Sequence, residues 1–152
     1  MKRPIPYVLV MMLMVFSIAT HSQNVPAAKP KLFATFPDKI SCANTELNKV
    51  FNSTTDQNIS LSFSDNFLFS GIVISNVVKY TNLQTAIIKS PAFGDAIFVL
   101  SRISNADRSV SYVGRIINTK YFDGYELKKD AANNYQLIKI ETDKVIQVCS
   151  QN

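Results

Sequence analysis

The chain has 152 residues, of which 16 are Lys or Arg and 11 are Asp or Glu, so its formal net charge is +5. The basic residues are scattered along the chain instead of forming a stripe, which argues against a nucleic-acid partner. Two cysteines alone cannot build a structural zinc site, and four glycines leave no glycine-rich phosphate loop.

The first residues have the pattern of a secretory signal peptide. Lys2 and Arg3 provide a basic start, and an apolar run follows over Val8 to Ala19. A membrane-spanning helix needs roughly 20 apolar residues, so this run is too short to cross a bilayer comfortably. We expect residues 1–22 to be removed after Ser22, with cleavage after Ala19 or an uncleaved anchor as alternatives. The mature protein is then secreted or periplasmic, with no integral membrane span.

Residues 23–31 contain two prolines and no periodic pattern, so we expect a flexible linker there. The remaining 32–152 has the length of one domain. Its two cysteines, Cys42 and Cys149, lie near its two ends. An oxidising compartment favours one structural disulfide between them, with two unpaired thiols or a bond to another chain as alternatives.

The first element of the domain reads as a short helix. Ala43, Leu47, Val50 and Phe51 are spaced as one apolar helical face, and Ser41 can cap the first turn. This interpretation places Cys42 in the first turn of the helix.

From Ile59 onwards the apolar residues recur with a period of two, which is typical of strands. Gly71 in the second strand suggests a bulge or a tight bend. Because the intervening turns are short, neighbouring strands must be antiparallel. The strands are predicted over 59–64, 67–79, 83–89, 96–103, 109–118, 125–127, 135–141 and 145–149. The expected fold is mostly β (α+β): an antiparallel meander-type curved sheet, forming a small barrel or sandwich, with one short N-terminal helix packed on it.

Catalytic groups are scarce in the predicted domain. The one histidine, His21, lies at the cleavage site, so the domain offers no imidazole for a catalytic triad or a metal site. Asp123 with Glu126, and Glu141 with Asp143, are carboxylate pairs of the type that glycosidases use. Each pair is explained more simply by a turn residue and a solvated charge. We therefore predict a non-enzyme without metal or cofactor.

Aromatic and basic residues gather in the C-terminal half and give the candidate binding residues. Tyrosine and arginine are enriched at binding hot spots. The same spacing also arises from cross-strand pairs in a core, which is the simpler explanation. The candidates are Tyr112, Arg115, Tyr121, Tyr125 and Tyr135.

Several segments resemble a set of short secreted bacterial proteins of unknown function. They are 36–40 with Cys42 and the following helix, 67–71, 80–83, 114–116, 123–129 and the terminal Cys149. This resemblance implies secretion and a compact domain but no activity. A weaker similarity, carried by Gly114-Arg-Ile116, Tyr125-Glu-Leu127 and Leu137-Ile138, is to the β-rich prodomain-like regions of secreted metallopeptidases.

These observations together predict an exported, non-catalytic binding or structural module whose partner is an extracytoplasmic protein or a glycan. Two alternatives stay open. One is a peptidase-directed inhibitor or free-standing prodomain-like protein, which would fill a protease cleft with a strand edge or a loop. The other is a small carbohydrate-binding or carbohydrate-active domain.

Overall fold

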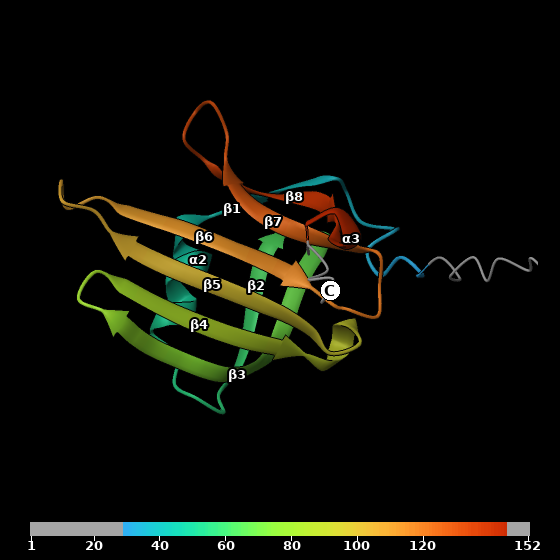
Figure 1. The fold of residues 1–152 in the computed structure, drawn as a ribbon, viewed down its shortest axis with the longest axis horizontal. Helices are drawn as coiled ribbons and strands as arrows, with labels where there is room; N and C mark the ends of the chain where they lie inside the picture. Colours follow the sequence, from blue (N-terminus) through green and yellow to red (C-terminus); the bar gives the residue numbers. More distant parts are fainter. Residues whose placement is uncertain (1–28, 146–152) are drawn as a thin grey trace, which may run out of the picture.

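A computed structural model describes residues 29–145 and confirms the predicted fold class (Figure 1). Its eight strands form one antiparallel sheet that curls into a nearly closed barrel. The elements are β1 (Lys39–Cys42), α2 (Asn44–Phe51), β2 (Asn58–Ser64), β3 (Phe67–Tyr80), β4 (Leu83–Ser90), η2 (Pro91–Phe93), β5 (Ala96–Ser104), β6 (Val110–Ile117), β7 (Asp123–Lys129), β8 (Tyr135–Glu141) and α3 (Thr142–Val145). No helix within 29–145 is long and apolar enough to span a membrane.

The sheet is a meander from β2 to β8 with β1 added at the far end. The strand order is β1-β8-β7-β6-β5-β4-β3-β2, so each strand from β2 onwards pairs with its neighbour in sequence. β1 pairs with β8, where Ile40 lies opposite Leu137 and Cys42 opposite Tyr135. Along most of the sheet, alternate residues point into the barrel, which is the arrangement that a period of two predicts. β3 departs from it at irregularities between Val73 and Ser75 and between Val78 and Tyr80.

Helix α2 lies where the barrel would otherwise be open, between β1 and β2 in the chain (Figure 1). It buries Leu47, Val50 and Phe51 on its inner face. On its outer side the Lys49 Nζ donates to the carbonyl of Ser60 (3.0 Å), and a Glu46 carboxylate oxygen accepts the Ser62 backbone N–H (2.9 Å). The helix thus satisfies polar groups on the edge of β2 that would otherwise invite another strand.

The sequence-based interpretation of residues 39–43 is wrong. Ser41 and Cys42 belong to β1, whose residues alternate between exposed and buried, and the helix starts at Asn44. Its N-cap residue is Ala43, and no side chain caps the first turn. The apolar positions Ile40 and Cys42 have strand spacing, and pairing with β8 uses it.

Two further expectations need correction. Val145 belongs to the short helix α3 and not to a final strand, while residues 146–149, with Cys149, lie outside the described residues. Gly71 is not at a bulge, because it pairs directly with Ile59. A Cβ on Gly71 would lie only 2.4 Å from the Lys89 carbonyl oxygen, so glycine permits β3 and β4 to approach closely.

The barrel interior is filled largely by aromatic side chains. Phe33, from the segment before β1, is fully buried and closes one end of the barrel. Its ring centroid lies 5.1 Å from that of Tyr125, 5.4 Å from Phe93 and 6.2 Å from Phe67. The other end of the barrel lies next to α2 and is more polar.

Candidate functional site

A chain of polar side chains crosses the α2 end of the barrel. The last carbonyl groups of a helix have no partner within the helix and need donors from elsewhere. The side-chain amide of Asn76 on β3 supplies them, with contacts to the carbonyl oxygens of Ser53 (2.7 Å), Phe51 (3.2 Å) and Val50 (3.4 Å). Asn76 is therefore held with its own oxygen pointing away from the helix.

That oxygen begins a relay towards β5. The Gln84 amide donates to Asn76 Oδ1 (2.8 Å) and so directs its own Oε1 towards a further donor. Arg102 provides it, with its Nη2 2.6 Å from Gln84 Oε1. Because a helix C-terminus presents only acceptors, each amide of the relay has one orientation that satisfies both of its ends. Gln84 also contacts the Phe51 carbonyl directly (3.4 Å), so Arg102 is held in place by the end of the helix through Gln84 and Asn76.

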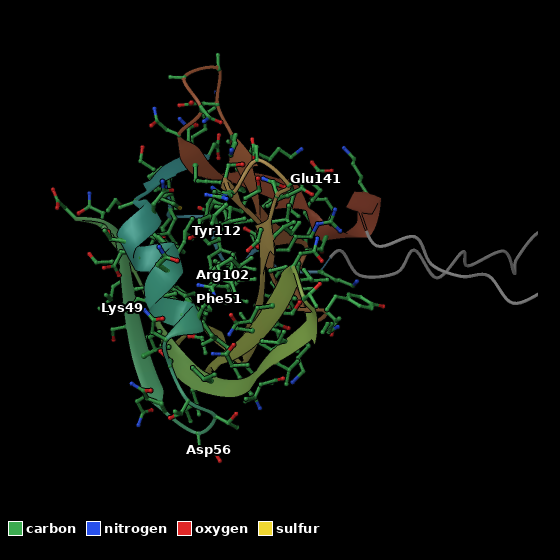
Figure 2. All side chains as sticks on the ribbon, turned by 90° about the vertical axis from the view of Figure 1, so that its left-hand side faces the viewer. Lys49, Phe51, Asp56, Arg102, Tyr112 and Glu141 are labelled. Carbon is green, nitrogen blue, oxygen red and sulfur yellow. The ribbon has the colours of Figure 1, made fainter. Side chains whose placement is uncertain are left out.

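The guanidinium of Arg102 also lies over an aromatic ring. Its central carbon is 5.0 Å from the centroid of Phe51, a cation–π arrangement. Figure 2 shows Phe51, Arg102 and Tyr112 together in the mouth of the barrel beside α2. We call this group, with Gln84 and Asn76, the Arg102 cluster.

Tyr112 belongs to the Arg102 cluster and is one of the predicted binding residues. It is 5% exposed, and its hydroxyl donates to Asn48 Oδ1 on α2 (2.6 Å). Its backbone N–H donates to the hydroxyl oxygen of Tyr135 (2.8 Å). Burial raises the pKa of Tyr112, and the positive charge of Arg102 opposes that rise.

Three of the five predicted binding residues point into the barrel. Tyr112, Tyr125 and Tyr135 are buried, and the Tyr125 hydroxyl donates to the Pro37 carbonyl (2.6 Å). Burial raises the pKa of Tyr125 well above its usual range. Tyr121 is half-buried in the turn before β7, where its backbone N–H donates to the Asn118 carbonyl (3.0 Å). These tyrosines fill and frame the core.

Arg115, the fifth candidate, lies on the outer face of the barrel. Its Nη2 is 2.7 Å from Glu126 Oε1, and Lys128 Nζ is 2.7 Å from the other oxygen of the same carboxylate. The hydrogen bonds from Lys128 and Arg115 lower the pKa of Glu126. The structure thus separates Arg115 from the buried tyrosines by the thickness of the sheet.

The carboxylates considered for catalysis are also separated. Asp123 points inward and accepts the backbone N–H groups of Leu32 (2.6 Å) and Phe33 (3.0 Å), whereas Glu126 points outward to Arg115. An open cleft of about 430 Å³ beside Asp123 is lined by charged groups that include Asp38, Lys139 and Glu141. Lys139 and Asp38 pair at 3.0 Å within it. Asp123 therefore acts as an anchor for the segment that closes this end of the barrel.

Exposed apolar side chains are concentrated on one strand. Eight large hydrophobic residues in the described part of the chain are exposed, and six of them belong to β3. The six are Leu68, Ile72, Ile74, Val77, Val78 and Tyr80. The other two, Val110 and Val113, lie on β6.

Within residues 29–145, the second half of β3 also has an unpaired edge. β2 pairs with β3 only as far as Ile72, and the following loop makes its backbone contacts at Val73. From Ser75 to Tyr80, β3 pairs with β4 alone. We call this segment, residues 75–80, the β3 overhang. An edge with apolar side chains and unpaired backbone groups is a template for an added strand.

Comparison of the chain with protein-family models, with curated proteins and with solved structures gave no match.

The sequence analysis did not single out Asn76, Gln84 and Arg102 as a group. A signal was present for Gln84 and Arg102, because each is a polar residue at an inward position of an otherwise apolar alternation. Asn76 breaks the alternation of Phe69 and Val73, and it lies opposite the buried Ala86 because β3 is irregular between Val73 and Ser75. Gln84 precedes the inward residues Ala86 and Ile88, and Arg102 follows Phe98 and Leu100. The register between three neighbouring strands brings these residues together. That register cannot be derived from the residue pattern of one strand.

Proposed function

We propose that this protein is a non-catalytic binding module that works outside the cytoplasm and takes up an extended segment of a partner protein along the β3 overhang. The observation that carries the proposal is the concentration of exposed apolar side chains on β3. Isolated exposed hydrophobic residues are common, but a group of them on one strand marks an interaction surface.

The form of the partner follows from the backbone of the β3 overhang. A segment in extended conformation can pair with the unpaired N–H and C=O groups, and its alternate side chains then meet the side chains of β3. Val77 and Val78 are 47% and 69% exposed, so both faces of the added strand would find apolar contacts. We therefore expect a partner segment that is extended and rich in apolar and β-branched residues.

The test is selection from a displayed library of random linear peptides against the domain that begins at Gln23. Enriched peptides should alternate apolar residues, and Val77→Lys should weaken their binding roughly tenfold or more. Val113→Lys is the matched control, because Val113 is an outward valine on β6 with similar exposure, 51%. Binders that respond equally to both substitutions, or a library that yields no alternating apolar peptide, would contradict the proposal.

Export is supported by the basic start and the short apolar run of the sequence. Intact-mass measurement of protein recovered from outside the cytoplasm should give a chain that begins at Gln23, with Thr20 as the alternative start. A recovered protein that retains Met1 would refute processing of the signal peptide.

A second candidate function, inhibition of a peptidase, uses the same edge. Peptidases commonly bind their substrates in extended conformation, and the β3 overhang presents an extended edge strand to such a cleft. Inhibition of a secreted peptidase that is lost in Val77→Lys and kept in Val113→Lys would favour this function over simple partner binding.

A further inference from the structure

Arg102 carries a positive charge that no carboxylate compensates within residues 29–145. None of the ion pairs in that part of the chain includes it, and Gln84 is its one hydrogen-bond partner there. A guanidinium has five N–H donors, so most of its donor capacity is unused. A partly buried charge is costly unless it is paired, which makes this arrangement a position for an anion.

Arg115 is the other arginine that lies on a described strand, and it is paired with a carboxylate. Arg115 on β6 makes two contacts to Glu126 from its Nε (3.0 Å) and Nη2 (2.7 Å). Arg102, which is less exposed to solvent, has a neutral amide and an aromatic ring instead. Arg115 uses several guanidinium N–H groups to bind a carboxylate, and at Arg102 the equivalent groups remain available.

Arg102 borders a small cleft at the mouth of the barrel. Its volume is about 90 Å³, and it is lined by Arg102 and Gln84 together with Val78, Tyr80, Thr81, Asn82, Leu83 and Ser104. A water molecule occupies about 30 Å³ in the liquid, so the cleft holds a group of about three heavy atoms. Pockets that enclose whole drug-sized ligands are roughly 300–1,000 Å³, so only the end of a ligand fits here.

The walls of this cleft favour an apolar group next to the anion. Val78 and Tyr80 both line the cleft, and both are 69% exposed. They offer contact area to a ligand that continues out of the cleft towards solvent. A single guanidinium matches the single charge and planar shape of a carboxylate.

We propose that the Arg102 cleft binds the carboxylate end of a ligand whose neighbouring group is apolar. The two carboxylate oxygens accept the guanidinium N–H groups that Gln84 does not use, and the apolar group rests on Val78 and Tyr80. The relay from α2 through Asn76 and Gln84 holds the guanidinium in place before the ligand arrives, so little ordering is needed on binding. This site shares Val78 and Tyr80 with the β3 overhang, but it uses the side chains of Arg102 and Gln84 and needs no strand added at the edge of β3.

The experiment compares N-acetyl-leucine with N-acetyl-leucinamide, two probes that differ in the presence of the carboxylate. Titration of the ¹⁵N-labelled domain at low salt should shift the Arg102 side-chain Nε–H and the Tyr80 amide with the acid only. Since hydrogen bonds to charged groups are the strong ones, Arg102→Gln should weaken binding of the acid about tenfold or more. Arg102→Lys keeps the charge but loses the planar guanidinium. Its affinity for N-acetyl-leucine should be lower than that of the unchanged protein and higher than that of Arg102→Gln.

Arg115→Gln is the matched control and should bind N-acetyl-leucine as the unchanged protein does. Inorganic phosphate serves as a third probe, and binding of phosphate in preference to the acid would overturn the assignment of a carboxylate. Equal shifts with the acid and the amide, or no shift at Arg102 with either probe, would overturn the site itself. The titrations with the three probes use the unchanged protein. They therefore test carboxylate binding at Arg102 even if Arg102→Gln fails to fold. The Val77→Lys variant should bind N-acetyl-leucine normally, which separates this proposal from the one about β3.

Discussion

The carboxylate of Asp123 accepts the backbone N–H of Phe33 at 3.0 Å, although the two residues are 90 positions apart in the chain. The other carboxylate oxygen accepts the N–H of Leu32 at 2.6 Å. One buried side chain at the start of β7 therefore fixes the segment that inserts Phe33 into the end of the barrel.

Asp123→Ala should destabilise the protein, because it leaves two backbone N–H groups without their acceptor. Each buried donor that loses its partner costs about 1–3 kcal/mol. Urea unfolding measures the loss, and Asp65→Ala in the turn between β2 and β3 is the exposed control. An effect of Asp123→Ala no larger than that of Asp65→Ala would show that the anchor contributes nothing.

Phe33→Ala should cost more than Phe36→Ala, although both rings belong to the same aromatic group. Removing a fully buried phenylalanine typically costs 3–5 kcal/mol, because it leaves a cavity. Phe33 is 0% exposed, whereas Phe36 is only partly buried against the core. Thermal unfolding of the two variants checks the order, and the reverse order would refute the role of Phe33 in closing the barrel.

Gly71→Ala should be severely destabilising for a steric reason. The added Cβ would lie 2.4 Å from the Lys89 carbonyl oxygen and 2.8 Å from a methyl carbon of Ile88, so β3 and β4 would have to separate. Ser70→Ala, one residue earlier in the same strand, is the control. A soluble Gly71→Ala protein with an unchanged urea midpoint would contradict the close approach of these strands.

Burial raises the pKa of the Cys42 thiol from 9.0 to about 12, with a backbone hydrogen bond opposing the rise. In the reduced protein the unfolded chain therefore releases this proton at lower pH than the folded one does. Stability should be unaffected by Cys42 below pH 9 and should fall as the pH rises from about 9 towards 12. Urea midpoints across this range, measured with reductant, should fall less steeply in Cys42→Ala, and parallel curves would refute the effect.

The Cys42–Cys149 disulfide stays a prediction, because Cys149 lies outside the described residues. Cys42 lies at the end of β1, which among the described strands pairs with β8 alone, so a bond to the last residues would hold this strand in place. We expect Cys42→Ser and Cys149→Ser to destabilise the oxidised protein equally, and the double variant to be no worse. Peptide mapping without reductant tests the bond directly, and two unmodified thiols in oxidised material would refute it.

The sequence predicted β2 to β6 and β8 to within one or two residues at each end, because each has a faultless period of two or a continuous apolar run between clear turns. β1 was missed because four residues carry too few alternations to stand out, and Ser41 is also a good helix cap. The Arg102 cluster was missed for a different reason. Asn76, Gln84 and Arg102 come from three strands, and their contacts follow from cross-strand register together with the position of the helix end.

The topology also dictates an order of folding events. Strands β2 to β8 form from hairpins between sequence neighbours, which close quickly. β1 and Phe33 instead have their partners on β8 and β7, so we expect the earliest part of the described chain to acquire its contacts last. During synthesis from the N-terminus, the protein cannot seal its barrel until β8 has emerged. A chain that is stopped before Tyr135 should therefore remain open and protease-sensitive.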